Sequence, residues 1–450
     1  MKLTLLLFFS VFSALAQNIN GKILETETNK PIEYVNVYLE KDESGTISNE
    51  KGEFNLELNS KIKPTDTIRF SIIGYTTKYH TFSKLKELNF IVNLSKKTEN
   101  LNEVTVTSKR ELKSTIPYKK LSSLKKGIYC FGSTLIDNKI FVIGGDKSFI
   151  EDAAKQTLQE VSYIPEATFL DFIKKSRSNF SWEKYNDELQ TYNIEKDTWL
   201  ISNLKFRNRA YHKIIYFNNK VYVLGGKTLS KSKEYQYLDN KIEVFNLNTN
   251  QIVVDNVNPH QAINFAAFAY LDNIIVMGGS IKLKNNGEKI YSDETHLYNI
   301  TSGYWYELPK MTKPKEVNGI IIKDKIYLVG GFNKTPLTEI ESYDLTNGKW
   351  NKEGDLFSGI EAPALTYCNN IIYIFSNGKI LTYNIVTKVL NEYKIELYVK
   401  GSQMHYYQDN LYILGGFKEY DYTKSPSANF SLIKLNDFSK TKIINSKKFN

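Results

Sequence analysis

The fold is decided by residues 221–229, VYVLGGKTL, an apolar run that breaks into Gly225 and Gly226. A Gly-Lys-Thr ending is typical of phosphate-binding loops, but such a loop needs another glycine five positions earlier and a helix after it. Here the earlier position is Val221, and a polar stretch leads into a second alternating strand. The two glycines therefore predict a turn at the end of a β-strand and not a nucleotide site.

The glycine pair recurs along the chain, each time at the end of an apolar strand. The copies are residues 144–145, 225–226, 278–279, 330–331 and 415–416, with a degenerate copy at Phe375-Ser376. Six residues before each copy stands a residue type that tolerates the left-handed backbone of a tight hairpin: Asn138, Asn219, Asp272, Asp324, Asn369 and Asp409. A repeat with a period near 50 residues indicates a fold built from stacked or radial units.

A second signal follows in three of the copies, where a tyrosine precedes a tryptophan by seven residues. The pairs are Tyr192 and Trp199, Tyr298 and Trp305, and Tyr343 and Trp350. With the glycine pairs, they make residues 126–450 resemble a kelch β-propeller of six four-stranded blades. We expect each blade to take its strands from consecutive sequence, without an exchanged strand, so that residues 103–108 stay outside the blades.

Blade 1 contains the longest insertion. Within it Ile150, Ala154, Leu158 and Val161 follow a helical spacing. We therefore expect a helical insertion, which either caps the mouth of the propeller or packs on its outer wall.

The first 16 residues, MKLTLLLFFSVFSALA, combine Lys2, a short apolar core and an Ala-Leu-Ala ending, which is the pattern of a signal peptide. We therefore expect an exported protein, periplasmic or associated with the cell surface or outer membrane. After removal of the signal peptide no stretch approaches the ~20 apolar residues of a membrane span, so none is expected.

Residues 17–97 contain five short alternating strands separated by turn signals, which predict a small β-sandwich. This segment resembles the carboxypeptidase regulatory-like domain, a transthyretin-like sandwich of bacterial envelope proteins. The residues that carry the resemblance are Gly21, Pro31, Val35, Val37, Gly45, Thr46, Gly52, Phe54, Gly74 and Tyr75. The resemblance implies an accessory role, and residues 98–125 are expected to form a linker. The chain as a whole is predicted to be all-β.

Composition excludes several function classes. The formal net charge is +10, but only five of the 59 basic residues are arginines and the lysines form no basic stripe, which disfavours nucleic acid as a partner. The five histidines show no paired metal spacing, so neither a metal nor another cofactor is expected. Cys130 and Cys368 belong to blades that are not adjacent, and we expect both to be free thiols.

Two groups of candidate binding residues emerge from the repeat. Long loops on a rigid scaffold commonly carry binding sites, and those that follow the glycine pairs contain Tyr235, Tyr237, Tyr291, Tyr420 and Tyr422. Fourteen positions before each first glycine lies a ring of equivalent residues, expected at one mouth of the central channel: Cys130, Tyr211, Asn264, Glu316, Glu361 and Gly401. Of these, Tyr211, Asn264, Glu316 and Glu361 are candidate binding residues, although both glutamates could instead be solvated residues at the start of a strand.

The sequence favours a non-enzymatic, exported binding or scaffold protein that holds a glycan or protein partner on the long-loop face. The alternative is a carbohydrate-active propeller, similar to the exported kelch sialic-acid mutarotase. In that alternative Glu316 or Glu361 transfers protons, with Arg209 nearby.

Overall fold

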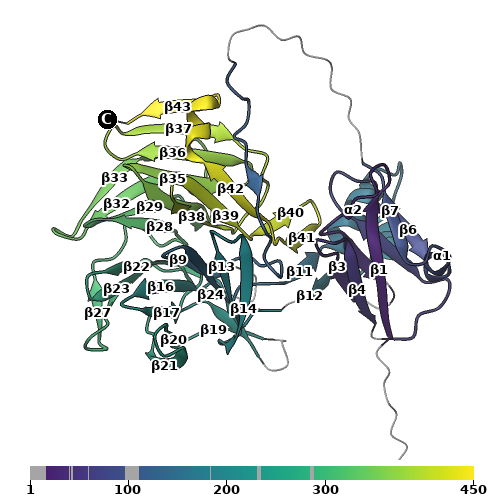
Figure 1. The fold of residues 1–450 in the computed structure, drawn as a ribbon, viewed down its shortest axis with the longest axis horizontal. Coiled ribbons are helices and arrows are strands. Elements are labelled where there is room, and N and C mark those ends of the chain that lie inside the picture. The colour runs from purple at the N-terminus through teal and green to yellow at the C-terminus, as the bar shows by residue number, and fades with distance from the viewer. Residues whose placement is uncertain are drawn as a thin grey trace, which may run out of the picture. The chain divides into compact units, whose positions relative to one another are not determined.

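The computed structural model describes residues 17–39, 41, 44–58, 60–96, 111–182, 184–230, 235–283 and 288–449 (Figure 1). The chain divides into two compact units, Met1–Lys109 and Arg110–Asn450, each of which is treated by itself. The expected signal peptide, most of the expected linker before residue 111, and residues 103–108 lie outside the described residues.

The N-terminal unit is a small β-sandwich, as predicted. Its sheets have the orders β4-β1-β7 and β3-β2-β5-β6. The elements are β1 (Gln17–Glu25), β2 (Asn36–Leu39), β3 (Ser44–Ile47), β4 (Glu53–Leu58), β5 (Thr67–Ser71), β6 (Lys78–Thr81), α1 (Phe82–Glu87) and β7 (Ile91–Leu94). Alternate side chains of β4 (Phe54, Leu56 and Leu58) enter the core between the sheets. Gly52 has φ +72, and a Cβ there would lie 2.4 Å from the Ile23 carbonyl oxygen, so this turn requires glycine.

Among the sheets of the second unit, we name the six that contain the inner strands blades 1 to 6, in chain order of those strands. Blade 1 consists of β9 (Gly132–Ile136), β10 (Lys139–Ile143), β13 (Glu188–Asn193) and β14 (Thr198–Lys205). Blade 2 consists of β16 (Lys213–Phe217), β17 (Lys220–Leu224), β20 (Lys241–Asn246) and β21 (Gln251–Val257). Blade 3 consists of β22 (Ala266–Tyr270), β23 (Asn273–Met277), β26 (Thr295–Asn299) and β27 (Trp305–Leu308).

Blade 4 consists of β28 (Gly319–Ile322), β29 (Lys325–Val329), β32 (Glu339–Asp344) and β33 (Lys349–Asp355). Blade 5 has five strands, β34 (Ala364–Cys368), β35 (Ile371–Ser376), β36 (Lys379–Asn384), β37 (Val389–Lys394) and β43 (Asn445–Lys448). Blade 6 consists of β38 (Gln403–Tyr407), β39 (Asn410–Leu414), β42 (Phe430–Lys434) and β8 (Lys119–Lys120).

The inner strands contact one another in a closed ring, in the order β9, β16, β22, β28, β34, β38 and back to β9. Figure 1 shows β9, β16, β22, β28 and β38 around the centre of the unit. On the outer strands the three predicted tyrosine–tryptophan pairs lie across from each other, with ring centroids 4.9–5.1 Å apart. The all-β class and the propeller-type domain predicted from the sequence are therefore confirmed.

The expectation that every blade takes its strands from consecutive sequence is wrong. The outer strand of blade 6 is β8, whose residues Lys119 and Lys120 pair with Leu432 and Ser431 of β42. After β42 the chain forms a 3₁₀ helix, η2 (Leu435–Lys440), and its last strand, β43, pairs with β37 of blade 5. Blade 6 therefore lacks an outer strand of its own, and a segment from before the propeller, within the expected linker, supplies it.

Further elements extend the loops of the propeller. Blade 1 and blade 6 contribute a joint sheet of order β12-β11-β41-β40. The elements are β11 (Phe149–Glu151), α2 (Ala153–Ser162), α3 (Phe169–Lys175), β12 (Phe180–Trp182), β15 (Arg209–Ala210), β18 (Lys227–Leu229), β19 (Gln236–Leu238), β24 (Ser280–Leu283), β25 (Lys289–Tyr291), β30 (Phe332–Asn333), β31 (Thr335–Pro336), β40 (Phe417–Glu419) and β41 (Thr423–Pro426).

Removing the segment that contains β8 should destabilise the propeller. A chain that begins at residue 126 loses β8 and the buried side chains of Ile116 and Leu124, whose burial stabilises by about 1.5–3 kcal/mol each. We expect it to unfold roughly 5–10 °C below a chain that begins at residue 111, as measured by calorimetry. Equal melting temperatures for the two chains would show that β8 does not close the ring.

The buried His260 and the half-buried His405 should make the propeller sensitive to acid. Burial lowers the pKa of His260 and of His405 to about 4, from an ordinary value near 6.5. Because the folded state holds both imidazoles neutral, their contribution to stability is fully present above pH 6.5 and is lost as the pH falls through about 4. We expect denaturant titrations of His405→Gln to show a shallower loss of unfolding free energy between pH 6.5 and 4 than the wild type. An unchanged slope would contradict the prediction.

Candidate functional site

The six equivalent residues that the repeat places before the inner strands all line one cavity at the mouth of the channel. They are Cys130, Tyr211, Asn264, Glu316, Glu361 and Gly401. The cavity has a volume of about 50 Å³, well below the ~300–1,000 Å³ of a typical small-molecule pocket. It can therefore enclose a small chemical group or a few waters, and the rest of any larger ligand would lie outside it.

The main chain around this mouth is strained. Cys130, Tyr211 and Asn264 have φ values of 49, 62 and 52°, in the left-handed region that non-glycine residues rarely adopt. Their amides form a chain of hydrogen bonds from blade to blade. Cys130 N–H donates to the Gly401 carbonyl at 3.1 Å, Tyr211 N–H to Cys130 at 2.7 Å, and Asn264 N–H to Tyr211 at 3.3 Å. Strain of this kind concentrates at functional sites.

Glu316 is a buried member of an ion pair. Its carboxylate oxygens lie 2.9 and 3.0 Å from Lys289 Nζ on β25, and Ser280 Oγ donates a further hydrogen bond to it. Only 1% of Glu316 is exposed. The carboxylate is therefore paired with the β24–β25 loop of blade 3, and the interpretation of Glu316 as a solvated residue at a strand start is wrong.

Glu361 has a different environment. Its side chain is exposed to the channel mouth and, among the described residues, has no hydrogen-bond or ion-pair partner. Crowding by the surrounding protein nevertheless raises the pKa of Glu361, and the charge of Glu316 adds to this effect while Lys289 opposes it. Because water still reaches the carboxylate, the desolvation is only partial. Of the two glutamates, only Glu361 presents an unpaired carboxylate to the cavity.

Lys213 is a cavity residue that the sequence analysis missed. It begins β16 of blade 2, and its Nζ donates a 2.9 Å hydrogen bond to Oδ1 of Asn318, in blade 4. Burial lowers the pKa of the Lys213 ammonium to about 8. The position two after each ring residue could have revealed it, because only blade 2 has a charged residue there. The other blades have Gly132, Ala266, Asn318, Pro363 and Gln403.

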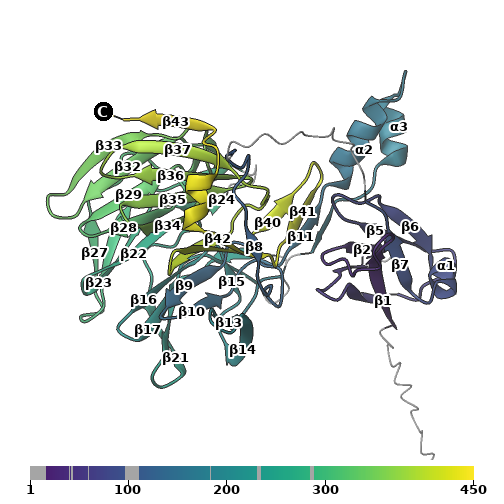
Figure 2. The same cartoon turned by 45° about the horizontal axis from the view of Figure 1, so that its top comes forward.

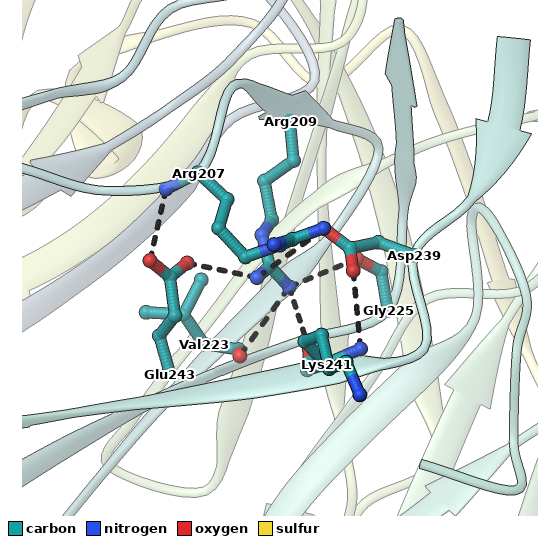
Figure 3. Close-up of polar contacts among 7 residues, drawn as sticks. All are labelled: Arg207, Arg209, Val223, Gly225, Asp239, Lys241 and Glu243. Atoms are coloured by element: carbon teal, nitrogen blue, oxygen red, sulfur yellow. Dashed lines mark hydrogen bonds and ion pairs between the residues drawn. The ribbon is translucent and has the colours of Figure 1, made fainter. Parts of the chain in front are cut away.

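Arg209 lies elsewhere, in the buried cluster shown in Figure 3. Its guanidinium is fully buried and lies 2.8 Å from Glu243 and 3.4 Å from Asp239. It also donates to the main-chain carbonyls of Val223, Gly225 and Lys241. The structure does not bring Arg209 to the cavity, so the expectation that it acts beside Glu316 or Glu361 is wrong. We infer that Arg209 anchors its own segment to the sheet of blade 2.

The Arg209 cluster is one case of a repeated contact that sequence reasoning also missed. In each of three blades a polar side chain of the third strand holds the segment that leads into the first strand. Glu243 binds Arg209, His296 Nδ1 lies 3.0 Å from His260 Nδ1, and Glu341 pairs with the buried Lys315. These third-strand residues stand opposite Val223, Val276 and Leu328, each two residues before its glycine pair. Alignment of the third strands on the glycines would therefore have found them.

The predicted loop tyrosines fall into two groups. Tyr235 and Tyr237, in and before β19, are exposed by 61% and 54%, and Tyr420 by 38%. Tyr291 is half-buried, and its hydroxyl accepts the amide of Lys334 at 3.1 Å. Tyr422 is also half-buried and donates to Gln159 of α2. Only the first group offers aromatic faces for a partner.

The predicted helical insertion is present as α2 and α3, joined to the joint sheet by β11 and β12. The amide of Asp152, the N-cap of α2, donates to the Tyr422 carbonyl at 2.7 Å, which ties the helix to the β40–β41 hairpin. Figure 2 shows both helices beyond the end of β11. Since α3 buries no residue, packing on the outer wall is wrong for this helix.

Both cysteines are free thiols, as predicted. Cys130 lines the cavity, and burial raises its pKa to about 12, so it remains a protonated thiol. Among the described residues no group of three or more His, Cys, Asp or Glu side chains could hold a metal ion. Within the same part of the chain, no helix is both long and apolar enough to cross a bilayer.

Comparison with known proteins identifies both units. Residues 19–106 match the family model of the CarboxypepD_reg-like domain, and residues 177–340 match that of the Attractin/LZTR1 beta-propeller. The chain is 32% identical to Kelch repeat and BTB domain-containing protein 2 of cowpox virus (strain GRI-90 / Grishak) over 136 residues, which are 30% of this chain and 23% of the viral protein. It is 25% identical to Kelch repeat and BTB domain-containing protein 12 of Homo sapiens over 177 residues, 36% of this chain and 28% of the human protein.

The chain thus spans less than a third of the length of these curated relatives. Among solved structures, one titled "Structure of YjhT" aligns with a TM-score of 0.51 at 11% identity, covering 70% of this chain and 99% of that one. At this identity the likeness shows the fold alone. The chain therefore contains a CarboxypepD_reg-like domain in its N-terminal unit and a Kelch/attractin-type β-propeller in its second unit.

Proposed function

We propose that this protein is a binding or scaffold protein that holds a protein partner on its long-loop face, with α2 and α3 as the principal contact. The observation that carries the proposal is the apolar surface of this helical pair. Six large apolar side chains on or between the two helices are exposed, Phe169 by 76% and Tyr163 by 75%. The full set is Leu158, Tyr163, Ile164, Phe169, Leu170 and Ile173. Apolar residues grouped in this way typically mark a protein interface.

The loops of the same face support the proposal. The segments after the glycine pairs contain strands that pair with each other, β18–β19, β24–β25, β30–β31 and β40–β41. Pairing of these strands lowers the ordering entropy that binding costs. Tyr235 and Tyr237 add exposed aromatic rings, which suit a protein interface or stacking on a sugar ring.

The N-terminal residues support a location for the partner. The signal-peptide pattern of residues 1–16 supports export, and the CarboxypepD_reg-like domain is an accessory module in the proposal. The partner would then be a protein or glycan of the cell envelope.

Substitution of the helical surface should weaken partner binding. We expect Phe169→Ser with Ile173→Ser to reduce capture of a crosslinked envelope protein by more than tenfold, because each change removes exposed apolar contact area without opening the core. The measurement is quantitative mass spectrometry of crosslinked envelope fractions against the wild type. Leu200→Ser, at another exposed apolar position on β14, is the matched control and should leave capture unchanged. Equal capture by the double variant would remove the helices from the interface.

A second candidate function rests on Glu361 alone. Its unpaired carboxylate and raised pKa suit a proton-transfer group, as in the sugar-mutarotase alternative. In a mutarotation assay with a sugar panel, Glu361→Gln should then lower turnover at least about 100-fold and leave the melting temperature unchanged. Absence of turnover in the wild type, or full turnover in the variant, would exclude this candidate.

A further inference from the structure

The amine of Lys213 is held in a position that is unusual for a lysine of a propeller. Its Nζ lies in the cavity lining, where Asn318 Oδ1 accepts its hydrogen bond. No carboxylate of a described residue lies within 4.0 Å of it. Lys213 is half-buried, and an ammonium without a carboxylate partner loses part of its hydration in such a position. The cavity therefore shifts the amine toward its neutral, nucleophilic form.

Asn318 connects the amine to the segment that carries Glu361. Its Oδ1 accepts from Lys213, while its Nδ2 donates to the Pro363 carbonyl at 2.8 Å. This second bond fixes the orientation of the amide, so that an oxygen and not a nitrogen faces the lysine. The same contact holds blade 4 to the strand start of blade 5, two residues after Glu361. The amine and the unpaired carboxylate thus line one cavity on a connected frame.

We propose that Lys213 captures small aldehydes or ketones as a reversible imine, with Glu361 as the proton-transfer group of this step. The neutral amine attacks the carbonyl carbon and forms a C–N bond, while the oxygen takes up a proton to give a carbinolamine. The nitrogen then loses its remaining proton, the hydroxyl leaves as water after protonation, and a C=N bond forms. The balance is one amine plus one carbonyl compound to one imine plus one water, with no oxidant or reductant.

The other cavity residues fit this chemistry. The Cys130 thiol stays protonated because burial raises its pKa, so it does not compete as a nucleophile. The pKa of Lys213 near 8 leaves roughly a fifth of the amine neutral at pH 7.4, about 200-fold more than for an ordinary lysine. Glu361, whose pKa is raised, can both accept and return a proton.

The size of the cavity limits the ligand. With about 50 Å³ enclosed, the site takes a carbonyl carbon with one or two neighbouring heavy atoms. Small aldehydes and ketones fit, as does the carbonyl end of a longer open-chain molecule whose remainder stays in the mouth. The inference concerns a site apart from α2 and α3, so its test is independent of the test of the protein-binding proposal.

Reductive trapping tests the proposal on the full chain. The protein is incubated with glycolaldehyde and cyanoborohydride at pH 7.4, and the modified lysines are mapped by mass spectrometry over time. We expect Lys213 to be modified at least tenfold faster than Lys220, an exposed lysine of the same blade. The rate at Lys213 should rise with pH and level off above about pH 8.

Two variants separate chemistry from folding. Glu361→Gln should slow modification of Lys213 several-fold and leave that of Lys220 unchanged, since only the cavity step uses the carboxylate. Lys213→Arg keeps a cation beside Asn318 and should retain the melting temperature while losing the fast-reacting site. Modification of Lys213 no faster than that of Lys220, or a rate at Lys213 that Glu361→Gln leaves unchanged, would overturn the proposal.

Discussion

The propeller depends on a ring of main-chain hydrogen bonds made by the second glycine of each pair. Its N–H donates to a carbonyl in the segment that leads into the next blade, at 2.8–2.9 Å. The donor–acceptor pairs are Gly145 and Arg209, Gly226 and Ala262, Gly279 and Lys315, Gly331 and Ile360, and Gly416 and Ile128. All ten glycines have positive φ, and a Cβ on Gly225 would lie 2.4 Å from the Phe265 ring of the next blade. The pair thus serves both the turn and the contact between blades.

Blade 5, which lacks the glycine pair, shows by contrast how the glycines affect the chain. There Phe375 and Ser376 continue β35 into a two-residue turn, and β36 follows directly. The bond to the next blade is made instead by Asn377 N–H to the Val399 carbonyl, at 3.2 Å. Where the glycines are present, the chain leaves the sheet and forms a loop above it. The same feature that joins the blades therefore also creates the long-loop face, and blade 5, which lacks it, contributes no such loop.

Much of this architecture could be predicted, because its signals are local. Glycine pairs, hairpin Asn or Asp residues and the tyrosine–tryptophan spacing each reflect a constraint within one blade. The strand β8 could not be predicted in this way, since Lys119 and Lys120 are exposed on an outer edge and carry no pattern of burial. The strand β8 takes the place of the outer strand that blade 6 lacks. Blade 6 lacks that strand because the chain after β42 continues to blade 5.

The candidate site also has one part that could be predicted from local signals and one part that could not. The repeat correctly placed Glu316 and Glu361 at one mouth, because the register of the inner strands is local information. It could not distinguish them, since the difference arises from Lys289, on a loop of blade 3 that reaches over Glu316. The contact of Lys213 with Asn318 could not be predicted for a similar reason, as Asn318 belongs to blade 4. The chemistry of the mouth is thus set by contacts between blades, and the ring of glycine bonds that holds the leading segments in register makes those contacts possible.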